Sequence, residues 1–340
     1  MVKIVVDAMG SDNYPTPDII GAVSDAREHD VQIILVGDEN LIRPILDTQN
    51  TVGLKIEVIH APEMLTMQDK GMGLVLKARR PNSKNSMAVG MDLLKTNQAD
   101  AFVTAGNTGA ASVTAYFRLG TIQGVDRPAL AAIFPTAQGS SIVMDIGANP
   151  DVKPENLLQF AIMGNIYAER VRGVHNPRIG LVSNGEEPGK GNQLVKEAYP
   201  LLAASNLNFI GNVEGKEVLG GNVDVTVTDG FTGNVMLKTA EAVAKLIIDK
   251  IKETIKNGSI LTKIGGLLIK NSMGKIKKLM DPSEEGAAPL LGINGLVFIG
   301  HGRSDALAIK NAIRVAKQAV DSNILASIKE AIENSLVVRK

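Results

Sequence analysis

Two turns of the same kind are the strongest candidates for chemistry in this chain. Residues 100–110 and 224–234 are identical at six aligned positions, and in each a short apolar run meets the pattern Gly-x-Thr-Gly. A helix-like pattern follows, so each turn becomes a helix N-terminus, whose free N–H groups and positive dipole end bind anions. The matched pair predicts a protein that binds phosphate or a similar oxyanion. The alternative is that Gly and Thr only cap two helices.

Further polar residues stand where other apolar runs end. We predict phosphate-binding residues in the two turns and in the helix after the second turn: Gly106, Asn107, Thr108, Gly109, Gly230, Thr232, Gly233 and Lys238. We predict catalytic residues among the polar side chains of these and other strand ends: Lys190, Asn184, Asn212, Asp229, Asn234 and His301.

The usual carriers of covalent and metal chemistry are missing from the sequence. There is no cysteine, which excludes a thiolate nucleophile and a Cys-ligated metal, and the four histidines lack zinc-site spacing. Neither the dinucleotide fingerprint nor a Gly-x-Ser-x-Gly elbow is present, and a P-loop-like stretch at 185–190 is one residue short. We therefore expect no cofactor and no metal. The remaining groups suit attack by a bound anion on an activated carbonyl, with fixed donors meeting the oxyanion.

The elements that position these residues are predicted to alternate between strand and helix. Helix-like stretches, for example 154–171, 234–256 and 304–320, lie between short runs that are mostly apolar on both faces, which predicts an α/β fold with a mostly parallel sheet. Carboxyl ends of parallel strands open on one edge, so we expect the polar turns to converge on one cleft. The strand-like runs are 3–6, 31–36, 55–59, 101–104, 142–146, 178–182, 208–210, 223–228 and 296–299.

Composition and charge narrow the class of protein further. Of the 340 residues, 44% are hydrophobic, enough for a large core, and no low-complexity linker divides the chain, so we expect one catalytic unit over 1–340. The 36 basic and 36 acidic residues balance, which argues against a nucleic-acid binder. The first apolar run stops at Asp7, too early for a secretory signal, and no run approaches the ~18–20 apolar residues of a spanning helix. We expect a cytoplasmic protein.

Nine motifs, in order from residue 2 to about residue 320, resemble those of one family, the bacterial phosphate acyltransferases (PlsX family). The similarity implies a three-layer α/β/α fold related to isopropylmalate and isocitrate dehydrogenases, in a homodimer. It also implies a reaction: inorganic phosphate attacks the thioester of a long-chain acyl-acyl carrier protein, and the acyl phosphate feeds phospholipid synthesis through a glycerol-3-phosphate acyltransferase. The motifs are 7–12, 105–110, 127–129, 145–149, 190–192, 209–214, 228–234, 289–295 and 301–305.

This chemistry agrees with the residues themselves. A thiolate leaving group with a pKa of roughly 8.5 needs little help from an acid, and phosphate is itself the nucleophile. We place Asn107, Thr108, Thr232 and Asn234 at the phosphate, with Lys190 or Lys238, and Asn184, Asn212 and His301 at the thioester carbonyl. Asp145 and Asp229 are predicted to orient other groups. Two departures from the family's usual sequence are Thr104, where Ser is usual, and Ala287, where Gly is usual.

Two basic stretches stand out in this neutral chain. Residues 254–280 contain six lysines, no acid and apolar residues at roughly helical spacing, which predicts a lysine-rich amphipathic segment over 254–283 that protrudes and contacts the membrane surface. The alternative is an ordinary surface or dimer helix. Residues 71–91 also lack acids and carry Lys77, Arg79, Arg80 and Lys84, either a docking patch for an acidic carrier protein or a solvated loop.

Three classes of function remain open. The first is the long-chain phosphate acyltransferase, peripherally bound to the membrane. The second is a fold relative, either a short-chain acyl-CoA phosphotransferase or a decarboxylating dehydrogenase, although the latter needs a nicotinamide loop and a carboxylate cluster for a metal. The third is a non-catalytic membrane scaffold for lipid synthesis, which only 254–280 supports.

Overall fold

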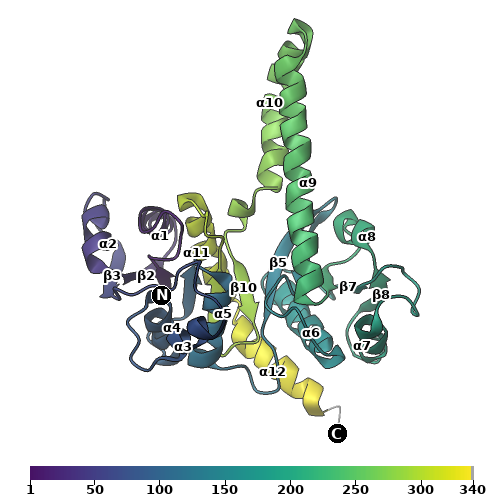
Figure 1. Cartoon of the computed structure of the whole chain (residues 1–340), viewed down its shortest axis with the longest axis horizontal. Coiled ribbons are helices and arrows are strands. Elements are labelled where there is room, and N and C mark those ends of the chain that lie inside the picture. The colour runs from purple at the N-terminus through teal and green to yellow at the C-terminus, as the bar shows by residue number, and fades with distance from the viewer. Residues whose placement is uncertain (338–340) are drawn as a thin grey trace.

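A computed structural model describes residues 1–337, in which eleven strands form one sheet with helices on both faces (Figure 1). The order across the sheet is β3-β2-β1-β4-β11-β10-β5-β6-β9-β7-β8. All nine predicted runs fall on strands, whereas β5 and β10 were not predicted. The strands are β1 (Val2–Asp7), β2 (Val31–Gly37), β3 (Lys55–His60), β4 (Ala101–Thr104), β5 (Ala129–Thr136), β6 (Gly139–Met144), β7 (Ile179–Val182), β8 (Phe209–Val213), β9 (Val225–Val227), β10 (Ala288–Leu291) and β11 (Leu296–Ile299).

Strand direction reverses in the middle of the sheet. The strands β1–β4 and β11 are parallel to one another, and so are β6–β9. However, β10 is antiparallel to both β11 and β5, and β5 is antiparallel to β6, so the two parallel groups run in opposite directions. The expectation that all strand-end turns converge on one edge is therefore wrong. The carboxyl ends of β1, β4 and β11 lie at one edge, and those of β6–β9 lie at the other.

Alternate residues of each central strand are buried on opposite faces, which produces three layers. Val103 of β4 belongs to a core cluster covered by α1 (Thr16–Glu28), α2 (Glu39–Leu46), α6 (Pro154–Arg170), α7 (Gln193–Ala203), α11 (Ala306–Asp321) and α12 (Ile324–Val337). Phe102 belongs to the opposite cluster, covered by α3 (Gly71–Arg79), α4 (Ser86–Lys95), α5 (Thr108–Leu119), α8 (Gly215–Gly220) and the base of α9 (Gly230–Asn257). The predicted three-layer fold with a mostly parallel sheet is confirmed.

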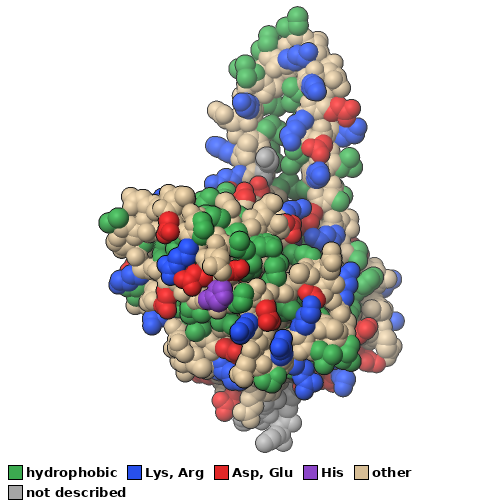
Figure 2. Space-filling model, turned by 60° about the vertical axis from the view of Figure 1, so that its left-hand side comes forward, with side chains coloured by type: hydrophobic (Ala, Val, Ile, Leu, Met, Phe, Trp, Pro, Cys, Tyr) green, Lys and Arg blue, Asp and Glu red, His purple; other side chains and the backbone are tan. Residues whose placement is uncertain are grey.

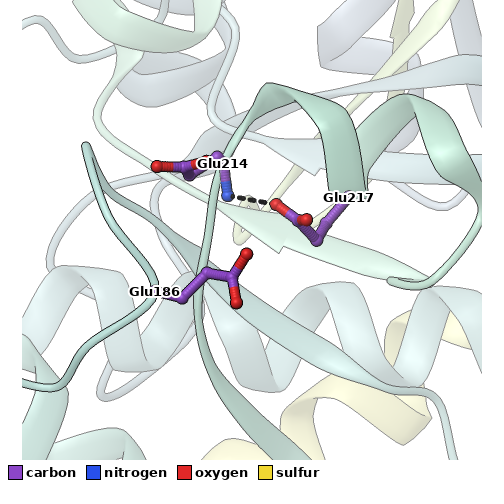
Figure 3. A group of neighbouring side chains, drawn as sticks. All are labelled: Glu186, Glu214 and Glu217. Carbon is purple, nitrogen blue, oxygen red and sulfur yellow. Dashed lines mark hydrogen bonds between the residues drawn. The ribbon is translucent and has the colours of Figure 1, made fainter.

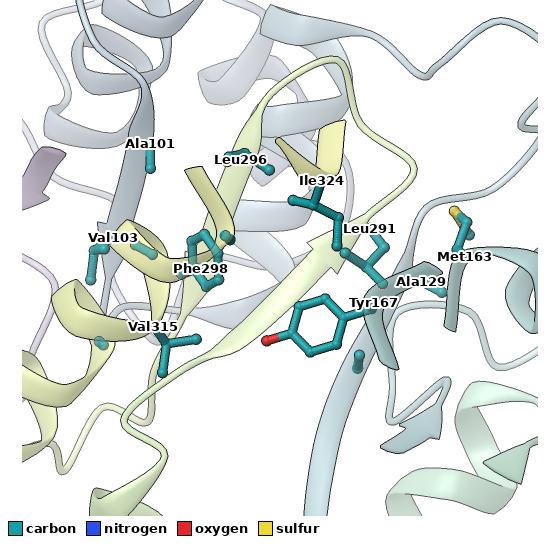
Figure 4. Packing of buried hydrophobic residues seen from close by; sticks show 14 of the residues in the cluster. Ala101, Val103, Ala129, Met163, Tyr167, Leu291, Leu296, Phe298, Val315 and Ile324 are labelled. Carbon is teal, nitrogen blue, oxygen red and sulfur yellow. The ribbon is translucent and has the colours of Figure 1, made fainter. Parts of the chain in front are cut away.

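One of these clusters crosses the line where strand direction changes. Figure 4 shows Phe298 of β11 and Leu291 of β10 in the same packed layer as Tyr167 of α6. Ile324 of α12 packs in this layer too, near Leu291. Phe298 and Tyr167 are among the largest fully buried side chains. The two parallel groups thus share a continuous apolar core.

A helical hairpin projects from the body (Figure 1). It is formed by most of α9 and by α10 (Ile260–Leu279), which rejoins the sheet through a short 3-10 helix (Pro282–Glu284). The projection begins earlier than the expected 254–283 segment, because α9 leaves the core after Ala240. Figure 2 shows basic side chains along the hairpin and apolar ones at its tip. No helix within residues 1–337 combines the length and the apolar composition needed to span a bilayer.

Candidate active site

A cleft of about 520 Å³ lies beside the first of the two repeated turns. Three segments form it: the loop that leads into α3, the start of α5 and the carboxyl end of β11. Because β4 and β11 are parallel neighbours, the turns that follow them open side by side. The lining residues are Met67, Asp69, Lys70, Gly71, Leu74, Gly106, Asn107, Thr108, Gly109, Gly300, His301 and Gly302.

Buried hydrogen bonds hold the backbone of the first turn. The Thr104 hydroxyl donates to Asp7 Oδ2 at 2.7 Å and accepts the Gly106 N–H at 3.0 Å. Burial raises the pKa of Asp7, although the Thr104 hydroxyl opposes that effect. A Cβ at residue 106 would lie 2.5 Å from Met87 Cε and 3.1 Å from Thr104 Oγ1, so a larger residue would displace the Met87 methyl and crowd the Thr104 hydroxyl. This network makes the first turn a preorganised backbone feature.

The side chain of Asn107 is fully engaged in holding the site together. Its Oδ1 accepts the N–H of Ala110, and its Nδ2 donates to the carbonyl oxygens of Thr66 and Asp69. Asn107 therefore caps α5 and ties the cleft loop to it. The first bond within the helix comes from Ala111 N to Asn107 O, so the N–H groups of Thr108 and Gly109 precede the helical ladder, where helix N-termini can bind an anion.

The far wall of the site carries His301, next to two charged residues of α9. Lys238 Nζ lies 3.1 Å from Glu241 Oε2, and Glu241 Oε1 lies 3.8 Å from His301 Nε2. Burial lowers the pKa of His301, Lys238 and Arg303 lower it further, and Glu241 opposes them. These effects together favour the neutral imidazole over the imidazolium. Sequence reasoning missed Glu241, for which the only local signal was its i,i+3 spacing from Lys238.

The second repeated turn is docked against the loop that follows β6. Asp229 caps α9 by accepting both the N–H and the hydroxyl of Thr232. The N–H of Gly230 donates to Asn149 O, and a Cβ at Gly233 would collide with Asp145 O. Asp145 accepts five hydrogen bonds from four residues, Leu130, Gly147, Ala148 and Asn149, as expected of a residue that orients backbone donors. Asn234 lies against Gly147 of the same loop.

The third group of predicted residues follows β7 and β8. Asn184 Oδ1 accepts the N–H of Gly191, and Asn212 Nδ2 donates to Glu187 O, so both amides brace the loop that carries Lys190. Nearby, the carboxylates of Glu186, Glu214 and Glu217 face one another (Figure 3). The Lys216 ammonium lies 2.8 to 3.6 Å from all three, which makes this cluster an ion-pair network.

The structure thus separates the predicted site residues into two regions. It brings Gly106–Gly109 and His301 together at the cleft, and Lys238, on the helix that begins at the second turn, lies close enough to His301 to lower the pKa of its imidazole. Asp229, Gly230, Thr232, Gly233 and Asn234 lie at the opposite edge of the sheet, as do Asn184, Lys190 and Asn212. Because a helix rises 1.5 Å per residue, Lys238 lies about 12 Å along α9 from Gly230. That length of helix separates the second repeated turn from the charged group beside His301.

The chain matches one family model over nearly its whole length. A model described as "Fatty acid synthesis protein" matches residues 2–327. The phosphate acyltransferase of Halothermothrix orenii is 47% identical over 335 residues, covering 97% of this chain and 98% of that protein. The phosphate acyltransferase of Desulforamulus reducens is 45% identical over 334 residues, covering 98% of each.

Solved structures of similar fold have much lower sequence identity. A phosphotransacetylase from Streptococcus pyogenes superimposes with a TM-score of 0.58 at 16% identity, covering 98% of this chain and 94% of that one. A 4-hydroxythreonine-4-phosphate dehydrogenase from Klebsiella pneumoniae has a TM-score of 0.54 at 14% identity, covering 94% and 99%. These likenesses show a dehydrogenase-like α/β/α fold.

Proposed function

We propose a specific reaction for this chain, because it belongs to the matched family, whose curated members are phosphate acyltransferases (the PlsX family). The protein is an acyltransferase that transfers an acyl group to phosphate. As the donor we propose long-chain acyl-acyl carrier protein, and as the product acyl phosphate for phospholipid synthesis. A glycerol-3-phosphate acyltransferase would consume that product.

The observation that carries this proposal is the chemistry of the cleft. The N-terminus of α5 and the His301 imidazole line the cleft, the Lys238 ammonium lies near His301, and neither Ser nor Cys is among the lining residues. Such a site holds an anion rather than forming a covalent acyl-enzyme. The bound anion is then the nucleophile, as phosphate is in this reaction.

The proposed course of the reaction follows from these positions. Phosphate is held by the N–H groups of Thr108 and Gly109 and by Lys238, with its oxygen directed at the thioester carbonyl carbon. The new C–O bond forms, the tetrahedral intermediate collapses, and the C–S bond breaks as the thiolate leaves. Since a thiol has a pKa of roughly 8.5, its thiolate is a good leaving group near neutral pH.

The surface next to the cleft supports a carrier protein as donor. Helix α3 contributes Gly71 and Leu74 to the cleft, and it exposes the apolar side chains of Met72 and Leu76 and the basic side chains of Lys77 and Arg79, with the exposed Arg80 directly after it. Lys84 is exposed shortly after it. An acidic carrier protein seated here would place its thioester arm at the cleft mouth, with charge steering the encounter.

The hairpin supports a peripheral position on the membrane. Helix α10 contains no acid, and its exposed side chains include Ile260, Leu261, Leu267 and Leu268 together with lysines. Apolar burial and lysine attraction to anionic lipid combine at such a surface. We also propose that the protein is a cytoplasmic homodimer, for which the exposed apolar side chains of Val243, Leu246 and Ile247 on α9 offer a contact surface.

One assay distinguishes these proposals from their rivals. Purified protein is mixed with phosphate and either long-chain acyl-acyl carrier protein or short-chain acyl-CoA, and both acyl phosphate and free thiol are followed. Turnover with the carrier-bound donor supports the proposal. Preference for acyl-CoA would indicate a short-chain acyl-CoA phosphotransferase, and no turnover with either donor would favour a non-catalytic scaffold.

A further inference from the structure

The charged group beside His301 contains a carboxylate oxygen without a partner. Glu241 Oε2 accepts from Lys238 Nζ, but Glu241 Oε1 is buried and has no hydrogen-bond partner in the described part of the chain. A buried, unpaired carboxylate oxygen is costly, so its presence calls for a physical explanation. The group that it approaches is Nε2 of His301, at 3.8 Å, just beyond hydrogen-bonding distance.

We propose that Glu241 is a positioning residue for His301, which rests on the proposed acyl transfer to phosphate. Glu241 accepts the Nε2–H of His301 when the cleft holds its substrates, and this fixes the tautomer in which Nδ1 is the free base. Catalytic hydrogen bonds that are long without ligand often tighten when substrate binds. The pairing of a carboxylate with an imidazole is a recurrent way to orient a histidine base.

In the proposed reaction His301 takes up one proton and later gives it back, while Glu241 holds the imidazole in place. As an oxygen of dihydrogen phosphate attacks the thioester carbonyl carbon, its proton moves to His301 Nδ1. The C–S bond then breaks, the sulfur leaves with the electron pair, and the proton passes from the imidazolium to the thiolate. The products are acyl phosphate and free thiol, with His301 neutral again.

Glu241 is also expected to affect the pKa of the His301 imidazole, because the other charges around His301 are positive. Lys238 on α9 and Arg303 in the loop after β11 both disfavour the imidazolium, and burial does so most strongly, while Glu241 alone favours it. Replacing Glu241 by glutamine removes that one opposing charge. The pKa of His301 should therefore fall further, and the acid limb of the pH–rate profile should move to lower pH.

The decisive variant is Glu241→Gln, compared with Glu253→Gln. Glu253 lies on the same helix and forms the same kind of i,i+3 pair with Lys250, but far along the hairpin. We expect Glu241→Gln to lower kcat by about tenfold to a hundredfold while the KM for phosphate changes less than about threefold, and His301→Ala to lower kcat by at least about a hundredfold. The double variant should be no slower than His301→Ala, because coupled residues are not additive. Glu253→Gln should match the parent.

A measurement without turnover keeps this inference separate from the proposed function. NMR titration of the four histidines, with His301→Ala to assign the signal, should show a lower pKa for His301 in Glu241→Gln than in the parent. That result would stand even if the parent transferred no acyl group to phosphate. An unchanged titration, or a variant that changes only the KM for phosphate, would overturn the inference and leave Glu241 as a partner of Lys238 alone.

Discussion

At the first turn, a single hydroxyl connects a buried carboxyl group to the backbone that faces the cleft. Thr104 donates to Asp7 and accepts from Gly106, so one side chain sets the position of the N–H groups that follow. The capping amide of Asn107 completes the same network. In the proposed reaction these side chains would act on bound phosphate only indirectly, through the backbone that they hold.

Thr104→Val should therefore weaken phosphate binding indirectly, by loosening the backbone of the turn, although residue 104 itself makes no proposed contact with phosphate. The change keeps the shape but removes the hydroxyl from Asp7 Oδ2 and from the Gly106 N–H in a buried place, which costs about 1–3 kcal/mol of stability. We expect the KM for phosphate to rise at least about tenfold. Thr104→Ser keeps the hydroxyl and is the matched control, which should behave like the parent in steady-state kinetics. Equal KM values for Val and Ser would show that the network does not shape the turn.

A second buried carboxyl makes stability depend on pH. Burial raises the pKa of Asp18 to about 7, with a smaller contribution from repulsion by Asp7, while Ser11 opposes both. In the unfolded chain the same group titrates near pH 4. Between about pH 4 and pH 7 the folded state thus binds one more proton, so this contribution is present below pH 4 and is lost as the pH rises through 7.

Asp18→Asn should flatten that dependence while its amide oxygen still accepts from Ser11. Urea unfolding at several pH values from 4.5 to 7.5 gives the free energy of unfolding for parent and variant. We expect the difference to favour the variant increasingly as the pH rises. Parallel curves would mean that Asp18 keeps its charge state throughout this range.

The residues at the opposite edge of the sheet remain predictions for catalysis. Lys190 and Asn234 stand at strand-end turns, and Lys190 is exposed. We predict that Lys190→Ala and Asn234→Ala each lower kcat strongly, with circular dichroism unchanged. Turnover within twofold of the parent for both variants would remove that edge from the active site.

At the scale of elements, α9 joins three regions that are separate in the sheet. It begins at the second repeated turn, passes the cleft at Lys238 and Glu241, and ends in the hairpin. Helix α3 has a comparable double position, since Gly71 and Leu74 line the cleft while Lys77 and Arg79 are exposed basic residues. Each helix therefore links the chemistry to an outer surface.

Reversing charge beside α3 should impair the carrier-bound donor selectively. We expect Arg80→Glu with Lys84→Glu to raise the KM for acyl-acyl carrier protein about tenfold, and by less at high salt, because screening weakens charge steering. Turnover of a small acyl thioester should not change. The control, Lys196→Glu with Lys329→Glu, makes the same charge change on α7 and α12, which cover the other face. Equal effects of the two pairs would rule out docking at α3.

The hairpin should bind anionic vesicles through apolar and basic side chains together. Leu267 and Leu268 are 71% and 79% exposed, so Leu267→Glu with Leu268→Glu should release the protein while catalysis on soluble donor persists. Flotation with anionic vesicles at low and high salt measures this, and salt should weaken the parent's binding. Leu41→Glu with Val52→Glu, on the body, is the control. A parent that does not float at low salt would contradict membrane contact.

At the scale of the whole molecule, local patterns predicted the layers but not the reversal. Runs buried on both faces revealed nine strands, because such runs differ plainly from amphipathic helices. The two strands that were missed, β5 and β10, contain Pro135 and Pro289, and proline argues against a central strand. They are the strands that turn the second group around, through a pairing of Leu290 with Leu130 that no local pattern contains.

The site was predictable to the same extent. Short local segments placed Gly106–Gly109 and His301 at strand ends, and the structure brings these residues to one cleft. Other contacts depend on how distant segments meet in space and could not be predicted. Asn107 binds the loop at Thr66 and Asp69, and Glu241 approaches His301. For that reason the second turn was expected at the same cleft, although the reversal of the sheet carries it to the other edge.

The length of α9 sets a height as well as a connection. From Glu241 to the last residue of the helix, Asn257, sixteen residues rise about 24 Å at 1.5 Å each. With the tip of the hairpin resting on lipid, the cleft would lie at most about that distance from the bilayer surface, because the helix has a fixed length. The proposed acyl phosphate, with its long apolar chain, would then have at most this distance to cross between the cleft and the membrane. Adding or removing whole turns of the hairpin would change the distance in steps of about 5.4 Å.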